Sequence, residues 1–157
     1  MSYIIERTVK EILDWFEKCK LTIPRCIEKS VDYFKWTDKQ MSVYIDNILN
    51  GYYINPIVIT NNDVLNADGK TIEHYNLISG VEKLGTLIIF TKNNLRINLN
   101  NDFHSKYNHS SFEDLDKETQ EDFLNTNLKI LVFDSTDKSN SDLSDEEFII
   151  NIFNRYN

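Results

Sequence analysis

The spacing of apolar residues along the chain predicts four longer helices, each opening at a Ser or Thr with Glu or Gln three residues later. In such a capping box the hydroxyl accepts a hydrogen bond from the helix backbone, and the longer side chain reaches back to the cap residue. The pairs are Thr8–Glu11, Thr37–Gln40, Ser79–Glu82 and Ser144–Glu147. Apolar residues then recur every three or four positions, which is typical of a helix with one buried face. These patterns run to about Lys20, to Asn50-Gly51, to Phe90 and to the C-terminus.

Shorter apolar or alternating segments between these helices predict strands. They cover 57–60, 73–78, 95–99 and 128–133, and Asp68-Gly69 between the first two is a hairpin turn signal. A short helix is expected over 117–124, capped by Asp116. Helices and strands follow one another without a regular alternation, so the pattern indicates a small α+β domain.

The composition of the chain predicts a single soluble domain in a reducing compartment. The chain has 157 residues, 41% of them hydrophobic, and two cysteines, which is too few for a disulfide framework. It contains no apolar run that would span a bilayer and no secretory signal pattern at its start, so we expect an intracellular or cytoplasmic protein without membrane contact. Asn and Ile occur 19 times each and Ala once, which indicates an AT-rich genome such as that of a virus or mobile element.

The negative charge is concentrated in the last part of the chain. Residues 1–110 carry 13 acidic and 13 basic side chains, whereas residues 111–157 carry 12 acidic and 4 basic ones, and so hold the whole net charge of −8. Acidic surfaces repel phosphate backbones, so direct DNA binding by this chain alone is not expected. A solvated acidic face is the main interpretation, and an acidic protein that mimics DNA is a weaker alternative.

Local motifs for catalysis or metal binding are not found. Gly69-Lys70-Thr71 lacks the earlier glycine of a phosphate-binding loop, because that position is Val64. The three histidines do not have zinc-site spacing and are expected at the surface, and the two cysteines are expected to be inert buried thiols. The histidines are His74, His104 and His109, and the cysteines are Cys19 and Cys26. We therefore expect no metal site and assign no catalytic residue from local motifs.

Three further stretches stand in the order known from one protein family. They are 21–24 with 36–40, 45–51 and 54–57, then 75–87, then Ile-Phe-Asn-Arg-Tyr-Asn at 152–157. Together they resemble the N-terminal domain of GmrSD-type modification-dependent restriction enzymes, within the ParB/sulfiredoxin-like superfamily. The resemblance covers nearly the whole chain. It implies one domain over 1–157, with a mixed sheet packed by helices and without a nuclease domain.

The family carries a D-G-Q-Q-R motif at a strand-to-helix turn, associated with binding and hydrolysis of nucleotides. A helix N-terminus offers free amides and a positive dipole end to phosphate, in keeping with that role. In this chain Gly80 is kept, while Ser79, Val81, Glu82 and Lys83 replace the Asp, the two Gln and the Arg. Arg155 and Asn157 match the C-terminal motif, which implies that they support the turn or touch a ligand. The resemblance thus makes Ser79, Gly80, Glu82, Lys83, Arg155 and Asn157 candidate nucleotide-binding residues, with an NTP and Mg²⁺ as the possible ligands.

The substitutions replace the motif residues that nucleotide chemistry needs and keep the turn glycine that the fold needs. Ser79 supplies no carboxylate, and Glu82 brings negative charge to the place where phosphate would bind. We therefore expect a catalytically degenerate ParB/GmrSD-N-like domain that acts as a binding or regulatory module for an unknown protein partner. The alternative is an NTP-binding or NTP-hydrolysing subunit of a DNA restriction or defence system, working with a nuclease in trans.

Overall fold

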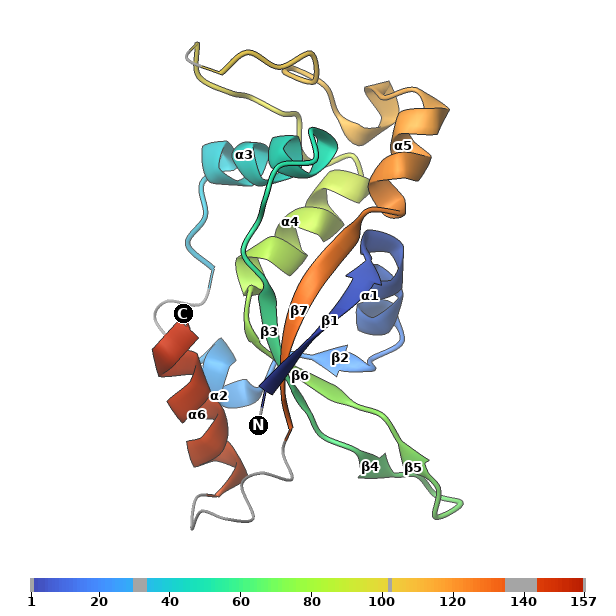
Figure 1. The fold of residues 1–157 in the computed structure, drawn as a ribbon, viewed down its shortest axis with the longest axis vertical. Helices are drawn as coiled ribbons and strands as arrows, with labels where there is room; N and C mark the ends of the chain where they lie inside the picture. The colour runs from blue at the N-terminus through green and yellow to red at the C-terminus, as the bar shows by residue number, and fades with distance from the viewer. Residues whose placement is uncertain (1, 30–33, 102, 135–143, 157) are drawn as a thin grey trace.

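A mixed five-stranded sheet with helices on both faces forms the body of the molecule (Figure 1). The computed structural model describes residues 2–29, 34–101, 103–134 and 144–156. The strand order is β1-β7-β3-β6-β2, with β1/β7 and β3/β6 antiparallel and β7/β3 and β6/β2 parallel. The strands are β1 (Ser2–Thr8), β2 (Leu21–Thr22), β3 (Ile57–Asn61), β6 (Tyr75–Ser79) and β7 (Asn127–Asp134). The predicted α+β class is confirmed, including a mixed sheet packed by helices.

The larger core lies on one face of the sheet. Residues that alternate along the central strands, Ile57 and Ile59 on β3 and Leu77 on β6, pack against the apolar sides of four helices. The helices are α1 (Val9–Glu17), α3 (Asp38–Leu49), α4 (Val81–Thr91) and α5 (Lys117–Leu124), with the 3-10 helix η1 (Phe112–Asp114) before α5. Phe90 and Phe123 stack edge to face at 5.3 Å in this core, which joins α4 to α5.

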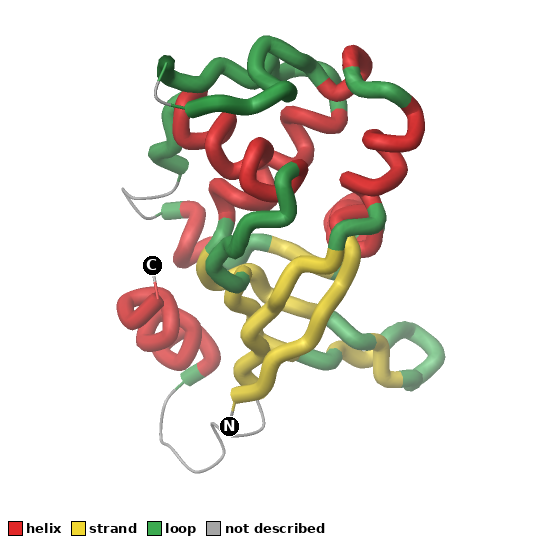
Figure 2. The backbone as a smooth tube through the Cα atoms, turned by 45° about the horizontal axis from the view of Figure 1, so that its top comes forward, coloured by secondary structure: helices red, strands yellow, loops and turns green. Residues whose placement is uncertain are grey.

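The opposite face of the sheet has its own smaller core. Val58 and Ile78 point to this side and pack with Ile27 of α2 (Arg25–Glu28) and Ile152 of α6 (Asp145–Tyr156). Figure 1 shows α2 and α6 side by side, and Figure 2 shows α6 apart from the larger group of helices. Among the described helices, none is both long enough and apolar enough to cross a bilayer.

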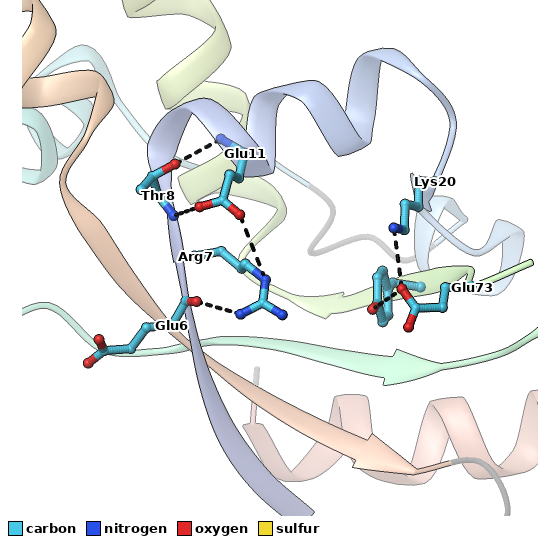
Figure 3. Close-up of polar contacts among 7 residues, drawn as sticks. Glu6, Arg7, Thr8, Glu11, Lys20 and Glu73 are labelled. Atoms are coloured by element: carbon cyan, nitrogen blue, oxygen red, sulfur yellow. Dashed lines mark hydrogen bonds and ion pairs between the residues drawn. The ribbon is translucent and has the colours of Figure 1, made fainter.

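Three of the four predicted helix starts agree with the structure. Thr8 with Glu11 and Thr37 with Gln40 form complete capping boxes at α1 and α3, the first drawn in Figure 3. The hydroxyl of Ser144 accepts from the Glu147 N–H at 3.2 Å, just before α6. The predicted cap of α5 is also confirmed, because the Asp116 carboxylate accepts from the Thr119 N–H at 2.7 Å.

The predicted Asp68-Gly69 turn closes a β-arm that extends beyond the sheet (Figure 1). Its short strands, β4 (Val64–Leu65) and β5 (Thr71–Ile72), pair only with each other among the described strands. Gly69 has a φ of +75°, the left-handed conformation that glycine adopts without strain. The Asn66 side chain accepts from the N–H groups of Asp68 and Lys70, which fixes the tip of the arm.

The expectations for 95–99 and for Cys19 are wrong, and each has a physical reason. Leu95–Leu99 forms no strand. Its alternate residues are buried as predicted, but Ile97 hydrogen-bonds with residues 109 and 110 of a neighbouring loop and does not join the sheet. Cys19 is exposed and does not face the core, because α1 ends at Glu17 and the chain then turns through a φ of +58° at Cys19. Cys26 is partly buried.

Candidate functional site

A cavity of about 620 Å³ lies between α3, the start of α4 and two loops. Cavities that hold small molecules span about 300–1,000 Å³, so this one has the size of a ligand site. The described lining combines aromatic rings, amide side chains and two lysines, and it contains no Asp or Glu. The lining residues are Trp36, Lys39, Gln40, Val43, Tyr44, Asn47, Tyr53, Ile54, Asn55, Lys83, Asn100 and Phe103.

One face of α3 forms a wall of this cavity. Gln40, Val43, Tyr44 and Asn47 follow the three-and-four spacing that places residues on the same side of a helix. Trp36, just before the helix, packs edge to face against Tyr44 with ring centroids 5.4 Å apart. The capping box at Thr37 fixes where α3 begins, and it thereby fixes how the tryptophan meets the wall.

The hydroxyl of Tyr44 is a buried polar atom without a hydrogen-bond partner among the described residues. The residue is only 5% exposed, and burial raises the pKa of the phenol well above its ordinary value. Buried hydroxyls normally find a partner, since leaving one unpaired costs free energy. This hydroxyl lies beneath the wall of the cavity, and the tyrosine contributes its ring to the lining.

Lys83 is the cation that the first turn of α4 brings into the cavity. Its Nζ donates to the carbonyl oxygens of Asn55 at 3.0 Å and Pro56 at 3.3 Å, which anchors the ammonium beside the loop before β3. Burial lowers the pKa of Lys83 from its ordinary value. An ammonium has three donors, so one N–H remains for an anion.

The strand-to-helix turn differs from its predicted form. Ser79 and Glu82 do not make a capping box. Gly80 is the N-cap residue, with a φ of +112°, and no side chain caps the helix. The Ser79 hydroxyl donates instead to the carbonyl of Tyr156 at 3.1 Å, and the Glu82 carboxylate accepts from the backbone N–H of Lys35 at 2.8 Å. The capping-box pattern placed the helix start one residue too early, because Ser79 still belongs to β6 and the helix begins after Gly80, whose positive φ glycine adopts readily.

The candidate residues therefore separate into two places. Lys83 lies in the cavity, whereas Ser79 contacts the end of α6 on the side of the smaller core. The C-terminal segment meets the turn through the backbone carbonyl of Tyr156, which was not one of the predicted residues. The Arg155 side chain is exposed and bonds within α6 to Asn151 at 3.3 Å. Asn157 lies outside the described residues.

Sequence reasoning missed most of the lining, including Tyr44, Tyr53 and Phe103. These residues come from separate segments of the chain, so no local motif predicts that they meet. The expectation of surface histidines holds for His104 and His109, but His74 is half-buried and bonds the Thr22 hydroxyl at 3.0 Å.

Within the described ranges, no group of three His, Cys, Asp or Glu side chains is arranged to hold a metal ion. Comparisons of the chain with protein-family models, with curated proteins and with solved structures gave no match. The chemistry of the cavity must therefore be argued from its own lining residues.

Proposed function

We propose that the chain is a binding module whose ligand carries a flat ring and a negative charge, and that this ligand enters the cavity between α3 and α4. The observation that carries the proposal is the make-up of the lining, with two lysines, several rings and no described carboxylate. The lining thus differs in charge from the chain as a whole, whose net charge is −8. A local positive field in an acidic protein draws anions to that place.

The aromatic side chains supply the ring-binding part. Tyr53 is 72% exposed and Phe103 is 41% exposed, while Trp36 is held against the wall by Tyr44. Large rings left open to water beside a cavity lose little by stacking on a flat ligand, and they gain the burial of apolar area. The amide groups of the lining offer donors and acceptors for the polar edge of such a ring system.

Lys83 supplies the anion-binding part, together with Lys39. The two carbonyls that Lys83 contacts hold its ammonium in place before a ligand arrives. Because the group is partly desolvated, its charge acts in a medium of lower dielectric constant than water. A nucleotide combines a ring and an anion in one molecule, and is therefore the ligand class to test first.

Binding is favoured over hydrolysis as the function. Cleavage of a phosphoanhydride needs a group that orients water or holds a metal ion, and carboxylates usually serve these purposes. The described lining offers lysines, amides and rings. Glu82, the nearest acid of the predicted motif, is bonded to the Lys35 backbone. This supports a degenerate ParB/GmrSD-N-like domain used as a binding or regulatory module over an NTP-hydrolysing subunit.

The DNA-mimic alternative has less support from the arrangement of the acidic residues. Acidic residues of the last part of the chain lie on η1 and α5, which pack on the larger core, and on α6, which packs on the opposite face of the sheet (Figure 1). A DNA mimic needs its charges in one continuous stripe, and this distribution divides them.

Fluorescence of Trp36 tests the proposal. The chain has two tryptophans, and Trp15 lies away from the cavity against Tyr75, so a Trp15→Phe variant leaves Trp36 as the only tryptophan, which is excited selectively over tyrosine at long wavelength. In that background we expect nucleotides to change the emission saturably. Lys83→Ala should weaken binding about tenfold or more, the loss of one charged hydrogen bond. Lys92→Ala, an exposed lysine at the other end of α4, is the matched control and should leave the affinity unchanged.

The pH dependence of the affinity gives a second readout. Since burial lowers the pKa of Lys83, its ammonium loses its proton at a lower pH than an ordinary lysine does. We expect affinity for an anionic ligand to fall as the pH rises toward 10.5, and to stay flatter in Lys83→Arg, because arginine keeps its charge. Phosphate release measured on the same samples distinguishes the alternatives, since steady release would establish hydrolysis. If no nucleotide or other anionic ring compound changes Trp36 emission, the proposal is wrong.

A further inference from the structure

The outer edge of β1 presents unpaired backbone groups, and three contacts show which ones. In an antiparallel pair, residues alternately face the partner strand and turn away from it. Val9 follows β1, and its N–H donates to the carbonyl of Thr126. The odd-numbered residues of β1 therefore direct their backbone N–H and C=O groups toward β7. The Glu6 carbonyl accepts from the Arg7 guanidinium at 2.7 Å, and the Thr8 N–H donates to the Glu11 carboxylate (Figure 3). The even-numbered residues of β1 therefore direct their N–H and C=O groups outward.

This edge lacks most of the features that prevent strand pairing. β1 is seven residues long and contains no proline and no lysine. Ile4 is 60% exposed and Tyr3 is 43% exposed, and no described residue hydrogen-bonds the outward backbone groups of Ile4. An edge strand with exposed apolar side chains and outward backbone groups is a template for a further strand.

We propose that the β1 edges of two copies of this chain pair antiparallel about a two-fold axis through Ile4, so that the sheet continues across the dimer. Ile4 then lies opposite Ile4 of the second copy, and Ser2 lies opposite Glu6. The outward N–H and C=O groups of Ile4 meet those of its counterpart in a hydrogen-bonded pair. Those of Ser2 meet the groups of Glu6, whose carbonyl has a second lone pair besides the one that accepts from Arg7. The same surface serves both copies, which makes a closed interface.

The side chains match in this register on both faces of the sheet. Ile4 is the neighbour of Leu131 on β7, so the pairing forms one apolar row of two leucines and two isoleucines across the interface. On the other face Tyr3 meets Ile5 of the second copy, and both have apolar neighbours on β7. Apolar pairs directly opposite each other stabilise a sheet, and burying Ile4 and Tyr3 removes apolar area from water.

Neighbouring registers are less favourable. An axis through Glu6 would place two carboxylates directly opposite each other, which is destabilising. An axis through Ile5 would put Ile4 against Glu6 and would need the N–H of Thr8, which is already bonded to Glu11. Charge and hydrogen bonding therefore favour the axis through Ile4 over these two.

Disulfide trapping tests both the pairing and its register. Cys19 and Cys26 are first changed to Ser, and Ile4→Cys is then introduced. Directly opposed residues of a hydrogen-bonded pair lie about 5.5 Å apart between Cα atoms, within the range that a disulfide spans. We expect mild oxidation to give a cross-linked dimer. Glu6→Cys alone should give none, because its opposite residue is Ser2, and a mixture of Ser2→Cys and Glu6→Cys chains should give the cross-linked pair.

Sedimentation equilibrium provides an independent measurement on the unmodified protein. We expect a concentration-dependent dimer that Ile4→Lys abolishes, whereas Leu65→Lys on the β-arm, where the side chain is 74% exposed, leaves it intact. A circular dichroism spectrum checks that Ile4→Lys is folded. The proposal is overturned if the native chain stays monomeric at all concentrations. It is also overturned if Glu6→Cys cross-links to itself as readily as Ile4→Cys does, or if Leu65→Lys dissociates the dimer.

Discussion

Replacing Gly80 with alanine tests why the turn before α4 keeps its glycine. Gly80 has a φ of +112°, a conformation that costs other residues about 1–3 kcal/mol. A Cβ at this position would lie 3.2 Å from Cγ1 and 3.3 Å from Cγ2 of Ile57, which is 2% exposed and has no room to move. Overpacking of a core costs about 1–3 kcal/mol. Gly80→Ala should therefore lower the free energy of unfolding by about 2–4 kcal/mol, from strain and crowding together.

Urea unfolding followed by circular dichroism measures this loss, and Gly69→Ala is the control. Gly69 also has a positive φ, but nothing lies within 4 Å of a Cβ built there, so its replacement should show backbone strain alone, about 1 kcal/mol. A double-mutant cycle with Ile57→Ala isolates the contact. In the Ile57→Ala background, which lacks both γ carbons, Gly80→Ala should cost less than it does in the native chain.

The reasoning fails if Gly80→Ala is as mild as Gly69→Ala, or if the two substitutions in the cycle are additive. A different result would point to function. If Gly80→Ala kept the stability but weakened ligand binding, the glycine would be needed for close approach of a ligand and not for packing against Ile57.

Three further expectations can be checked with the same unfolding assay. Thr37→Ala should cost about 1 kcal/mol, because the hydroxyl caps α3. Ser79→Ala removes no helix cap and loses only the exposed hydrogen bond to the Tyr156 carbonyl, so it should cost less, about 0.5 kcal/mol. Burial lowers the pKa of His74, so stability should fall as the pH drops below 6.5 and the imidazole is forced to protonate; His74→Gln should reduce that fall between pH 7 and pH 5. Tyr44→Phe removes a buried hydroxyl without a described partner, so it should leave stability equal or higher.

The sequence predicted elements well where a local rule decides them. The Asp116 cap and the bounds of α5 follow from one side chain and a short apolar pattern, and the hairpin turn follows from Asp68-Gly69. The prediction of a strand at 95–99 was wrong. Alternating burial indicates an extended segment that packs on a core, but it does not show that the segment hydrogen-bonds to a neighbouring strand. β1 was missed because it pairs with β7, more than a hundred residues away, and its own pattern is mostly exposed.

The candidate site could be predicted only in part. Lys83 emerged from the resemblance, and it does line the cavity. Trp36 belongs to the stretch 36–40, one of those that carry the resemblance, and nothing in that stretch indicated that it faces a ligand. The packing of Tyr44 against Trp36 and the nearness of Phe103 depend on how α3, α4 and two loops come together. Such convergence is set by tertiary structure and leaves no mark in the spacing of residues.

The pairing of β1 with β7 also determines the order in which this protein can be completed during synthesis. β1 (Ser2–Thr8) leaves the ribosome before the other strands of the sheet, yet its only described partner strand ends at Asp134. Chains grow at about 5–20 residues per second, so β1 waits unpaired for several seconds while β3 and β6 already form their hairpin. During that interval both edges of β1 are open, and neighbouring nascent chains on one messenger RNA are the closest source of an identical strand.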